Sequence, residues 1–216
     1  IDPSTIAVMK PYLQDKHPEA VIYALNLIEQ SDEQESLRDS LPALLEHPSP
    51  RVRQEALRYI ERLKLTSALP RVRALFQSET DIGFREYGLR TLAALDPTEV
   101  QTTVSRYLDA PEIPIRRGAL VGVIRYGVGQ TTAKAADQLL VMAGQLDTET
   151  RVLAAQVIGE IGLPNYYQPL EILLKASTVK VRRAALDAAG KIKHPRLWPL
   201  VIDALAMGKI SVGPPY

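Results

Sequence analysis

The sequence contains no cysteine, which excludes disulfide bonds, thiolate zinc sites and cysteine nucleophiles. Histidine is also scarce. The three histidines each stand directly before a proline, at His17, His47 and His194, between segments that we expect to be helical. A donor or cationic side chain at such a place suits the free carbonyls of a helix end. We therefore expect these histidines to end helices, and we expect no metal site and no bound cofactor.

Long apolar runs and a strong net charge are missing too. No run approaches the roughly 20 residues of a membrane span, and no signal peptide opens the chain. The formal net charge is +1, which gives no overall attraction to nucleic acid or to anionic membranes. No P-loop, nucleophile elbow or zinc motif is present. The run YGVGQTT at 126–132 lacks the lysine and the preceding strand of a phosphate-binding loop, so it predicts a turn.

What the sequence does contain is a pattern of about 32 residues that recurs six times. Its position 0 falls at Ala20, Val52, Phe84, Ile115, Thr150 and Val181, in steps of 32, 32, 31, 35 and 31. Position +4 is always small, at Ala24, Ala56, Gly88, Ala119, Ala154 and Ala185. Positions +5 and +8 are apolar in every copy. The offsets 0, +4, +5 and +8 describe one face of an α-helix, so each copy predicts a buried helix.

Each of these helices is the second of a pair. Position −3 supplies four good N-cap residues, Ser49, Asp81, Asp147 and Thr178. Apolar residues at helical spacing upstream predict the first helices at 3–14, 34–46, 66–77, 97–109, 131–145 and 165–176, and a lone helix follows at 194–207. The long step of 35 predicts a longer turn or a lengthened helix at 127–132.

A helix pair cannot bury its apolar stripe alone, whereas stacked pairs bury it along the whole array. We therefore predict an all-α fold, an α-solenoid of about six stacked helix pairs plus a terminal helix, with residues 1–216 as one domain. We expect that domain to be excised from a longer chain, because residues 1–3 (IDP) lead directly into helical pattern and the final SVGPPY has no obvious cap.

The V-R-x-x-A-L pattern, as in VRQEALRYI, VRRAALDAAGKI and TRVLAAQVIGEIG, resembles HEAT repeats, and the short unit resembles those of bilin-lyase-like proteins. This resemblance implies a right-handed α-solenoid whose second helices line a concave surface. The segments HPEAVIYALNLIE and LPALLEHPSPRVRQEALR are also similar to the soluble HEAT segment of some bacterial membrane proteins. Those proteins combine a nucleotide-transporter-like membrane domain, HEAT repeats and a cyclic-nucleotide-binding domain.

An arginine occupies position +1 in five copies, at Arg53, Arg85, Arg116, Arg151 and Arg182. This position is N4 of the helix, where a cation opposes the helix dipole. Repetition of an unfavourable choice indicates a compensating partner, such as carboxylates or the carbonyl ends of adjacent helices. We expect a structural arginine ladder between neighbouring repeats, and a ligand-binding role is the alternative.

The outward face of the second helices is the better candidate for binding. Positions +6 and +10, with +3 and +7, should point away from the core. Among them, the candidate partner-binding face consists of Arg58, Tyr59, Arg62, Tyr87, Arg90 and Arg125. Arginine and tyrosine dominate binding hot spots, and the same mixture could hold phosphates. The alternative is an ordinary solvated helical face.

We expect a non-catalytic scaffold that binds a protein partner or neighbouring domains of its own chain. A module that binds nucleic acid or is linked to nucleotides is the second hypothesis, and a bilin-lyase-like subunit is the third. HEAT-like di-iron hydroxylases use repeated His-Glu pairs, and the chain has none. The lone Trp198 is expected to pack in the last helix. We expect a cytoplasmic bacterial protein, or the soluble part of a membrane protein, without direct membrane insertion of this segment.

Overall fold

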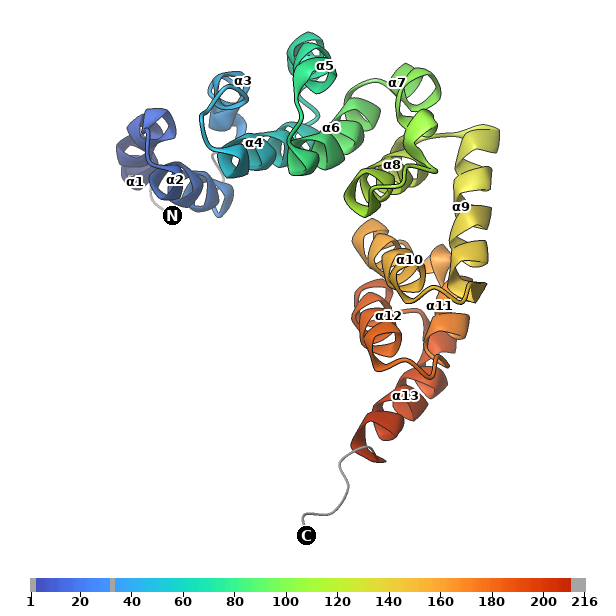
Figure 1. Ribbon diagram of the computed structural model, residues 1–216. Coiled ribbons are helices and arrows are strands. Elements are labelled where there is room, and N and C mark those ends of the chain that lie inside the picture. The colour runs from blue at the N-terminus through green and yellow to red at the C-terminus, as the bar shows by residue number, and fades with distance from the viewer. Residues whose placement is uncertain (1–2, 32–33, 211–216) are drawn as a thin grey trace. The chain divides into compact units, whose positions relative to one another are not determined.

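The structure is a computed structural model that describes residues 3–31 and 34–210 (Figure 1). Helices are the regular secondary structure throughout this described part, which contains no strand. The chain divides into two compact units, Ile1–Gly127 (unit 1) and Val128–Tyr216 (unit 2). The prediction of a single domain over residues 1–216 stays a prediction.

The second helix of each predicted pair is continuous. These helices are α2 (Pro18–Glu29), α4 (Pro50–Arg62), α6 (Ile82–Leu95) and α8 (Ile113–Tyr126) in unit 1, and α10 (Thr148–Ile161) and α12 (Val179–Ile192) in unit 2. Every residue at positions +4 and +8 is buried. The same holds at position 0 except for half-buried Ala20, and at +5 except for half-buried Leu186. The predicted buried face is confirmed.

The caps are only partly as predicted. Position −3 is the N-cap residue of all six second helices. Asp81 and Asp147 each accept a 2.7 Å hydrogen bond from the backbone three residues on. Ser49 and Thr178 occupy the N-cap position as predicted, but their side chains make no cap hydrogen bond. A carboxylate is also favoured there by the helix dipole, and a neutral hydroxyl lacks this attraction.

The first helices other than α9 are shorter than predicted, because most are interrupted. The whole set of first helices is α1 (Pro3–Met9), α3 (Leu41–Leu44), α5 (Leu69–Ser78), α7 (Pro97–Thr102), α9 (Gly129–Gly144), α11 (Gln168–Leu173) and α13 (Trp198–Ile210). All except α9 adjoin a separate 3₁₀ turn, at Lys10–Gln14, Gln34–Leu37, Thr66–Ala68, Val104–Tyr107, Pro164–Tyr166 and Pro195–Leu197. Prolines explain most of the breaks. Pro42, Pro70 and Pro169 occupy the first turn of their α-segments, where the missing N–H prevents the 3₁₀ turn from continuing as α-helix.

The long repeat step corresponds to a lengthened helix. At 16 residues, α9 is the longest helix of the described part, and it has no interruption. It begins at Gly129, two residues before the predicted start at 131 and inside the stretch 127–132 where the extra residues were placed. The expected lengthening is confirmed.

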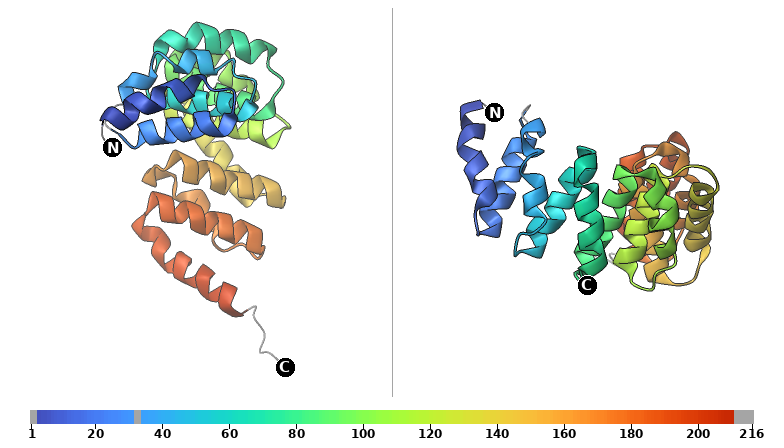
Figure 2. Two further views of the ribbon diagram at one scale, coloured as in Figure 1. Left: turned by 90° about the vertical axis from the view of Figure 1, so that its left-hand side faces the viewer. Right: turned by 90° about the horizontal axis from the view of Figure 1, so that it is seen from above.

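Within each unit the two kinds of helix lie on different sides. In unit 1, α3, α5 and α7 lie on one side of the row formed by α2, α4, α6 and α8 (Figure 1). In unit 2, α10 and α12 lie side by side, with α9 and α11 on one side of them, and Figure 2 shows the same arrangement from two other directions. The row of second helices in unit 1 is called the inner row below.

Glycine sets the distance between α6 and α8. A Cβ atom on Gly118 would lie 2.2 Å from the carbonyl oxygen of Glu86, and one on Gly122 would lie 3.3 Å from that of Leu89. The two helices therefore approach with their backbones almost in contact. In unit 2, a Cβ on Gly159 would lie 3.1 Å from the Cα of Ala188, so α10 and α12 also approach closely.

None of the helices in residues 3–31 and 34–210 combines the length and the apolar character needed to cross a membrane.

Candidate partner-binding surface of unit 1

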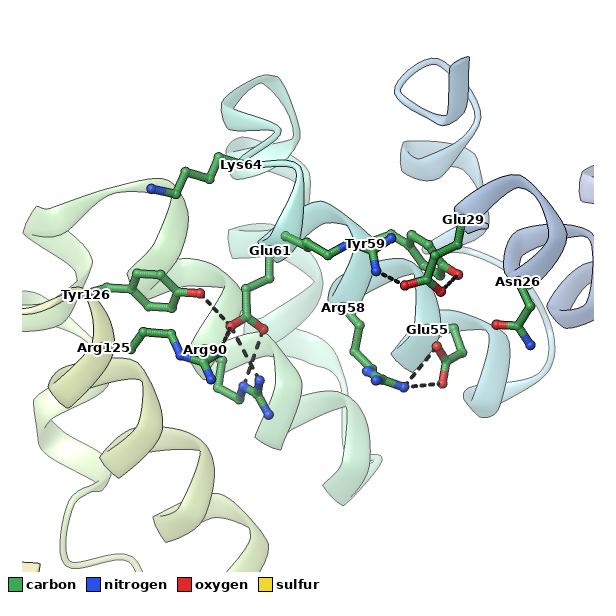
Figure 3. A pocket seen from close by; sticks show the side chains of 11 residues that line it. Asn26, Glu29, Glu55, Arg58, Tyr59, Glu61, Lys64, Arg90, Arg125 and Tyr126 are labelled. Carbon is green, nitrogen blue, oxygen red and sulfur yellow. Dashed lines mark hydrogen bonds and ion pairs between the residues drawn. The ribbon is translucent and has the colours of Figure 1, made fainter. Parts of the chain in front are cut away.

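A polar pocket of ≈ 410 Å³ opens on the inner row (Figure 3). It is lined by Asn26, Glu29, Glu55, Arg58, Tyr59, Glu61, Arg62, Lys64, Arg90, Arg125 and Tyr126. These residues come from α2, α4, α6 and α8, together with Lys64 just after α4, so four successive repeats contribute. The lining holds five basic and three acidic side chains, a net charge of +2.

The pocket brings together most of the predicted binding face. Five of its six residues line the pocket. The sixth, Tyr87, lies outside the lining, but its ring centroid is 5.2 Å from the Cζ atom of Arg90. Whether this face binds a partner stays a prediction, but the structure places its residues around one cavity.

A buried carboxylate, Glu61, lies at the inner end of the pocket with only 5% of its surface exposed. Arg125 and Tyr126 donate to its Oε1 atom at 3.1 Å and 2.7 Å. The Nε atom of Arg90 lies 3.3 Å from its Oε2 atom. One carboxylate of α4 is thus held by side chains of both α6 and α8. Glu61 and these three partners are called the Glu61 cluster below.

A second, more exposed group of side chains lies on α2 and α4. Glu29 accepts a 2.7 Å hydrogen bond from the hydroxyl of Tyr59 and also pairs with Arg62. The guanidinium of Arg62 lies over the Tyr59 ring, 4.7 Å from its centroid. Arg58 pairs with Glu55, one turn earlier on α4, at 3.0 Å and 3.2 Å. In contrast to Glu61, the side chains of Arg58 and Arg62 are 55% and 43% exposed.

These two groups differ in how firmly they are held. An exposed ion pair is worth about 0.2–1 kcal/mol, because water already solvates both charges well. Removal of one member of a buried pair costs about 3–5 kcal/mol, because the other charge is left in a poorly solvated place. The Glu61 cluster is therefore a fixed wall of the pocket, whereas Arg58 and Arg62 can exchange partners at little cost.

Part of the sequence-based geometry of this face is wrong. Positions +6, +7 and +10 were expected to point outward, yet Tyr59, Arg90 and Val121 are buried, with 3%, 7% and 0% exposed. The close approach of α8 to α6 explains Arg90, because a Cβ on Gly122 would lie 3.4 Å from the Cα of Arg90. A position that faces water in a loosely stacked pair is covered where two helices nearly touch.

The sequence-based reasoning also missed Glu61 itself. Its position, +9, holds an acidic residue in the first two copies, Glu29 and Glu61, but Ala93, Ile124, Gly159 and Gly190 in the others. Each of the two acids is paired with a +10 arginine of a later copy, Arg62 or Arg125. Each column of the repeat was considered by itself. A comparison of position +9 in one copy with position +10 in later copies could have found these acid–arginine pairs.

Burial alters the acidity of the two pocket tyrosines. Burial, together with a smaller contribution from the negative charge of Glu55, raises the pKa of Tyr59 to about 12. The pKa of Tyr126 is also raised to about 12 by burial, with a further contribution from Glu61. Burial removes water that would stabilise the phenolate. Both hydroxyls therefore stay protonated near neutral pH and act as hydrogen-bond donors to carboxylates.

The arginines at position +1 reach back to the turn that precedes their own helix. Arg53 donates to the carbonyls of His47 and Pro48 at 3.0 Å and 3.1 Å. Arg182, which is buried, donates at 2.7 Å to the carbonyls of Ala176 and Ser177. These carbonyls lie at or just beyond the end of the first helix of the same pair, so the guanidinium joins the two helices of one repeat.

The other members of this column vary more. Arg85 donates to the carbonyl of Glu79 at 3.3 Å, and Arg151 to that of Ala143 at 3.2 Å. The Nε atom of Arg116 is buried without a hydrogen-bond partner in the described part of the chain. Arg53 also forms an ion pair with Glu79 of the following repeat at 3.0 Å. The structural role of the column stays a prediction, and it is tested below.

Part of this surface lies in a segment that matches a known protein family. The family described as HEAT repeats matches residues 6–86, which include α2 and α4. The predicted resemblance to this family is confirmed by the match, whereas the resemblance to a segment of bacterial membrane proteins stays a prediction. No curated protein matches the sequence.

Solved structures extend the similarity along the chain. A chain from the complex of CpcE and CpcF of phycocyanin lyase from Nostoc sp. PCC7120 is 16% identical, with a TM-score of 0.61 over 96% of this chain and 82% of that one. Human deoxyhypusine hydroxylase in complex with glycerol is 14% identical, with a TM-score of 0.47 over 97% of this chain and 91% of that one. A designed armadillo repeat protein in complex with peptide (KR)4 is 16% identical, with a TM-score of 0.43 over 87% of this chain and 99% of that one. The predicted all-α solenoid class is confirmed.

Proposed function

We propose that the protein is a non-catalytic scaffold that binds a segment of a protein partner on the inner row of unit 1. The observation that carries this proposal is the pocket of ≈ 410 Å³ lined by arginine and tyrosine side chains from four successive repeats. These two residue types supply a large share of the binding energy in protein interfaces. A pocket shared between repeats also suits an extended segment that crosses several helices.

The small number of exchangeable cations in the pocket favours a protein over nucleic acid. Arg90 and Arg125 are held by buried Glu61, whereas Arg58 and Arg62 have exposed partners that they can exchange. Binding of a phosphate backbone depends on many cations that replace its counterions. A lining with a net charge of only +2 offers few such cations, whereas its many hydrogen-bonding groups suit a polypeptide.

A direct test is selection of peptides from a displayed library of random 15-residue sequences, followed by fluorescence anisotropy with the labelled peptides. We expect enriched peptides that lose about tenfold or more in affinity when Arg58 and Arg62 are both changed to Ala, the loss typical of hot-spot residues. Arg51→Ala is the matched control, because Arg51 lies on the same helix, is exposed and pairs with Glu19 outside the pocket. Its affinity should be unchanged.

Nucleic acid is the outcome that would overturn this proposal. A labelled 20-nucleotide single strand is measured beside the peptides over a range of salt concentrations. If no peptide is enriched while the oligonucleotide binds with a log–log salt slope of several units, the surface binds phosphates rather than protein.

A second candidate, a subunit of a bilin-lyase-like assembly, is favoured by one observation. The chain shares its fold with a chain of the phycocyanin lyase complex over 96% of its length. Addition of a free bilin to the purified protein tests this candidate. A shift of the bilin absorption band that saturates at one bilin per chain would favour this candidate. An unchanged spectrum would contradict it and would favour the non-catalytic scaffold.

A further inference from the structure

Building on the proposed function, we infer that the pocket selects partner segments that carry an acidic side chain. The carboxylate of that side chain binds Arg58 and Arg62 and replaces Glu55 and Glu29, which occupy these guanidinium groups in the unbound protein. The inference thus names the chemistry of the partner, an acidic peptide, and the two residues that read it.

Carboxylates already bind the two exposed arginines of the pocket in the unbound protein. Glu55 and Glu29 are carboxylates, and both are accessible, with 23% and 37% of their side chains exposed. A carboxylate from outside would offer the same two oxygens to the same donors. Exchange of one exposed ion pair for another keeps each arginine paired, and the Glu55 or Glu29 carboxylate that loses its arginine is accessible enough to be solvated by water.

Contacts within the protein already hold the guanidinium group of Arg62 in place. Arg62 lies over the ring of Tyr59, and that ring is fixed because Tyr59 is buried and donates to Glu29. A guanidinium on an aromatic face keeps its N–H groups free at the edge, where they can address a carboxylate. Arg58 lies four residues earlier on α4, which is about one helical turn away. Two positioned guanidiniums lose little freedom when they bind.

Arg58 and Arg62 differ from the arginines of the Glu61 cluster in how easily their partners can be displaced. Arg90 and Arg125 are already bonded to a carboxylate that is 5% exposed, so an incoming acid would have to displace a buried partner. The cluster therefore supplies the wall, and the exposed arginines supply the selectivity. Exposed Lys64, at the rim of the pocket, adds positive charge that attracts acidic segments.

The experiment compares two labelled 12-residue probes, an alternating Glu-Ser peptide and the matching Gln-Ser peptide, by fluorescence anisotropy at low salt. We expect the Glu-Ser peptide to bind about tenfold more tightly, since favourable charge pairing raises association and unpaired groups are penalised. Arg58→Gln and Arg62→Gln should each weaken the Glu-Ser peptide about fivefold and leave the Gln-Ser peptide unchanged.

The decisive variant acts in the opposite direction. Glu55→Gln removes the internal competitor of Arg58, so it should tighten binding of the Glu-Ser peptide about threefold. Two matched controls change the net charge by the same amounts outside the pocket. Arg51→Gln and Glu19→Gln alter an exposed pair that joins α2 and α4, and both should leave the affinity within twofold. Circular dichroism confirms that each variant keeps its helical fold.

Three results would overturn the inference: equal affinity for the two peptides, no measurable binding of the Glu-Ser peptide, or controls that shift the affinity as much as the pocket variants do. Each is distinguishable from failure of the proposed function. The library could yield peptides without acidic residues whose affinity still depends on Arg58 and Arg62. That result would support the binding surface and contradict its selectivity for acidic segments.

Discussion

Units 1 and 2 share one repeat but differ in the polar groups that they bury beside it. The buried polar and charged residues in the described part of unit 1 are Ser31, Glu61, Glu86, Arg90, Thr91 and Glu99. Those in unit 2 are Thr150 and Arg182. Unit 1 thus holds three buried carboxylates, and Glu61 and Glu86 lie between second helices, where Arg117 forms a bidentate pair with Glu86 at 2.6 Å and 2.9 Å.

Unit 2 shows that such ion pairs are not required for stacking. Its helices α10 and α12 approach closely through Gly159 and Ala188, and no ion pair between buried side chains joins them in the described residues. Buried ion pairs are also weak evidence for stability, because desolvation offsets most of their attraction. Buried ion pairs between second helices are therefore a feature of unit 1 rather than a requirement of the repeat.

The outer surfaces differ in the opposite sense. Large apolar side chains exposed in unit 1 are Val8, Tyr12, Tyr23 and Ile82. Those exposed in unit 2 are Val128, Leu140, Val141, Leu146, Leu163, Ile172, Val179, Trp198, Ile202, Leu205 and Met207. Trp198 was expected to pack in the last helix, yet it is 51% exposed, so that expectation is wrong. Its helix, α13, has no second helix of its own pair in the described part to cover it.

The largest expected effect breaks the buried network of unit 1. Glu61→Gln removes the counter-charge that Arg90 and Arg125 share, so the free energy of unfolding should fall by about 3–5 kcal/mol. Urea denaturation measures this loss. Glu61→Leu combined with Arg90→Met should recover most of it, because the apolar pair needs no counter-charge and Arg125, which is 29% exposed, can turn to water. If the single variant loses less than the double variant does, the network does not hold the inner row.

The next effect tests the close approach of α6 and α8. Gly118→Ala would place a Cβ 2.2 Å from a backbone oxygen, which can move only if the helices separate, so we expect a loss of about 2–3 kcal/mol. Gly190→Ala in α12 is the matched control, since a Cβ there meets nothing within 4 Å. It should instead stabilise by about 0.5–1 kcal/mol, because alanine favours helix more than glycine does. Thermal unfolding of both variants gives the comparison.

A smaller effect concerns the column of arginines at position +1, which both units share. Arg182→Ala leaves two carbonyls at the α11–α12 turn without their donor, and the expected loss is about 2 kcal/mol. Neighbouring Arg183, which is exposed, is the control, and its change to Ala should alter stability by less than about 0.5 kcal/mol. Arg116→Ala extends the test to unit 1. An unchanged melting temperature together with lost partner binding would show that this column binds ligand rather than stabilising the fold.

The smallest effect is a pH dependence that the two pocket tyrosines of unit 1 contribute. The pKa values of Tyr59 and Tyr126 are about 12 in the folded protein and about 10 when unfolded. The stability that this difference supplies is present below pH 10 and is lost as the pH rises from 10 to 12. At pH 11 we expect a loss of about 1 kcal/mol per tyrosine. Tyr126→Phe should make the free energy of unfolding less sensitive to pH by this amount, and an unchanged slope would contradict it.

The sequence was sufficient to predict the repeat and the buried face of each second helix, because those depend on one period that recurs in every copy. It could not predict the breaks in the first helices. Their prolines were visible, but a proline in the first turn of a helix is compatible with an uninterrupted helix in some contexts and with a new start in others. Which applies depends on packing against the next helix.

The candidate site was predictable only in part, for a related reason. Arg58 and Arg62 are exposed as expected because α4 leaves their positions open. Arg90 and Tyr59 are buried because particular neighbours cover them, and Glu61 functions through residues two copies away. A repeat pattern describes the average environment of a position. The properties of this pocket arise where individual copies depart from that average.

The position of Glu61 also has a consequence for folding. In most repeat arrays each repeat touches only its neighbours, so the chain can fold from any point and fray from either end. Glu61 bonds to Arg125 and Tyr126, which lie 64 and 65 residues later, beyond the intervening repeat. These bonds can form only when three repeats are in place. The segment from α4 to α8 is therefore expected to fold and unfold as one cooperative block within an otherwise locally connected chain.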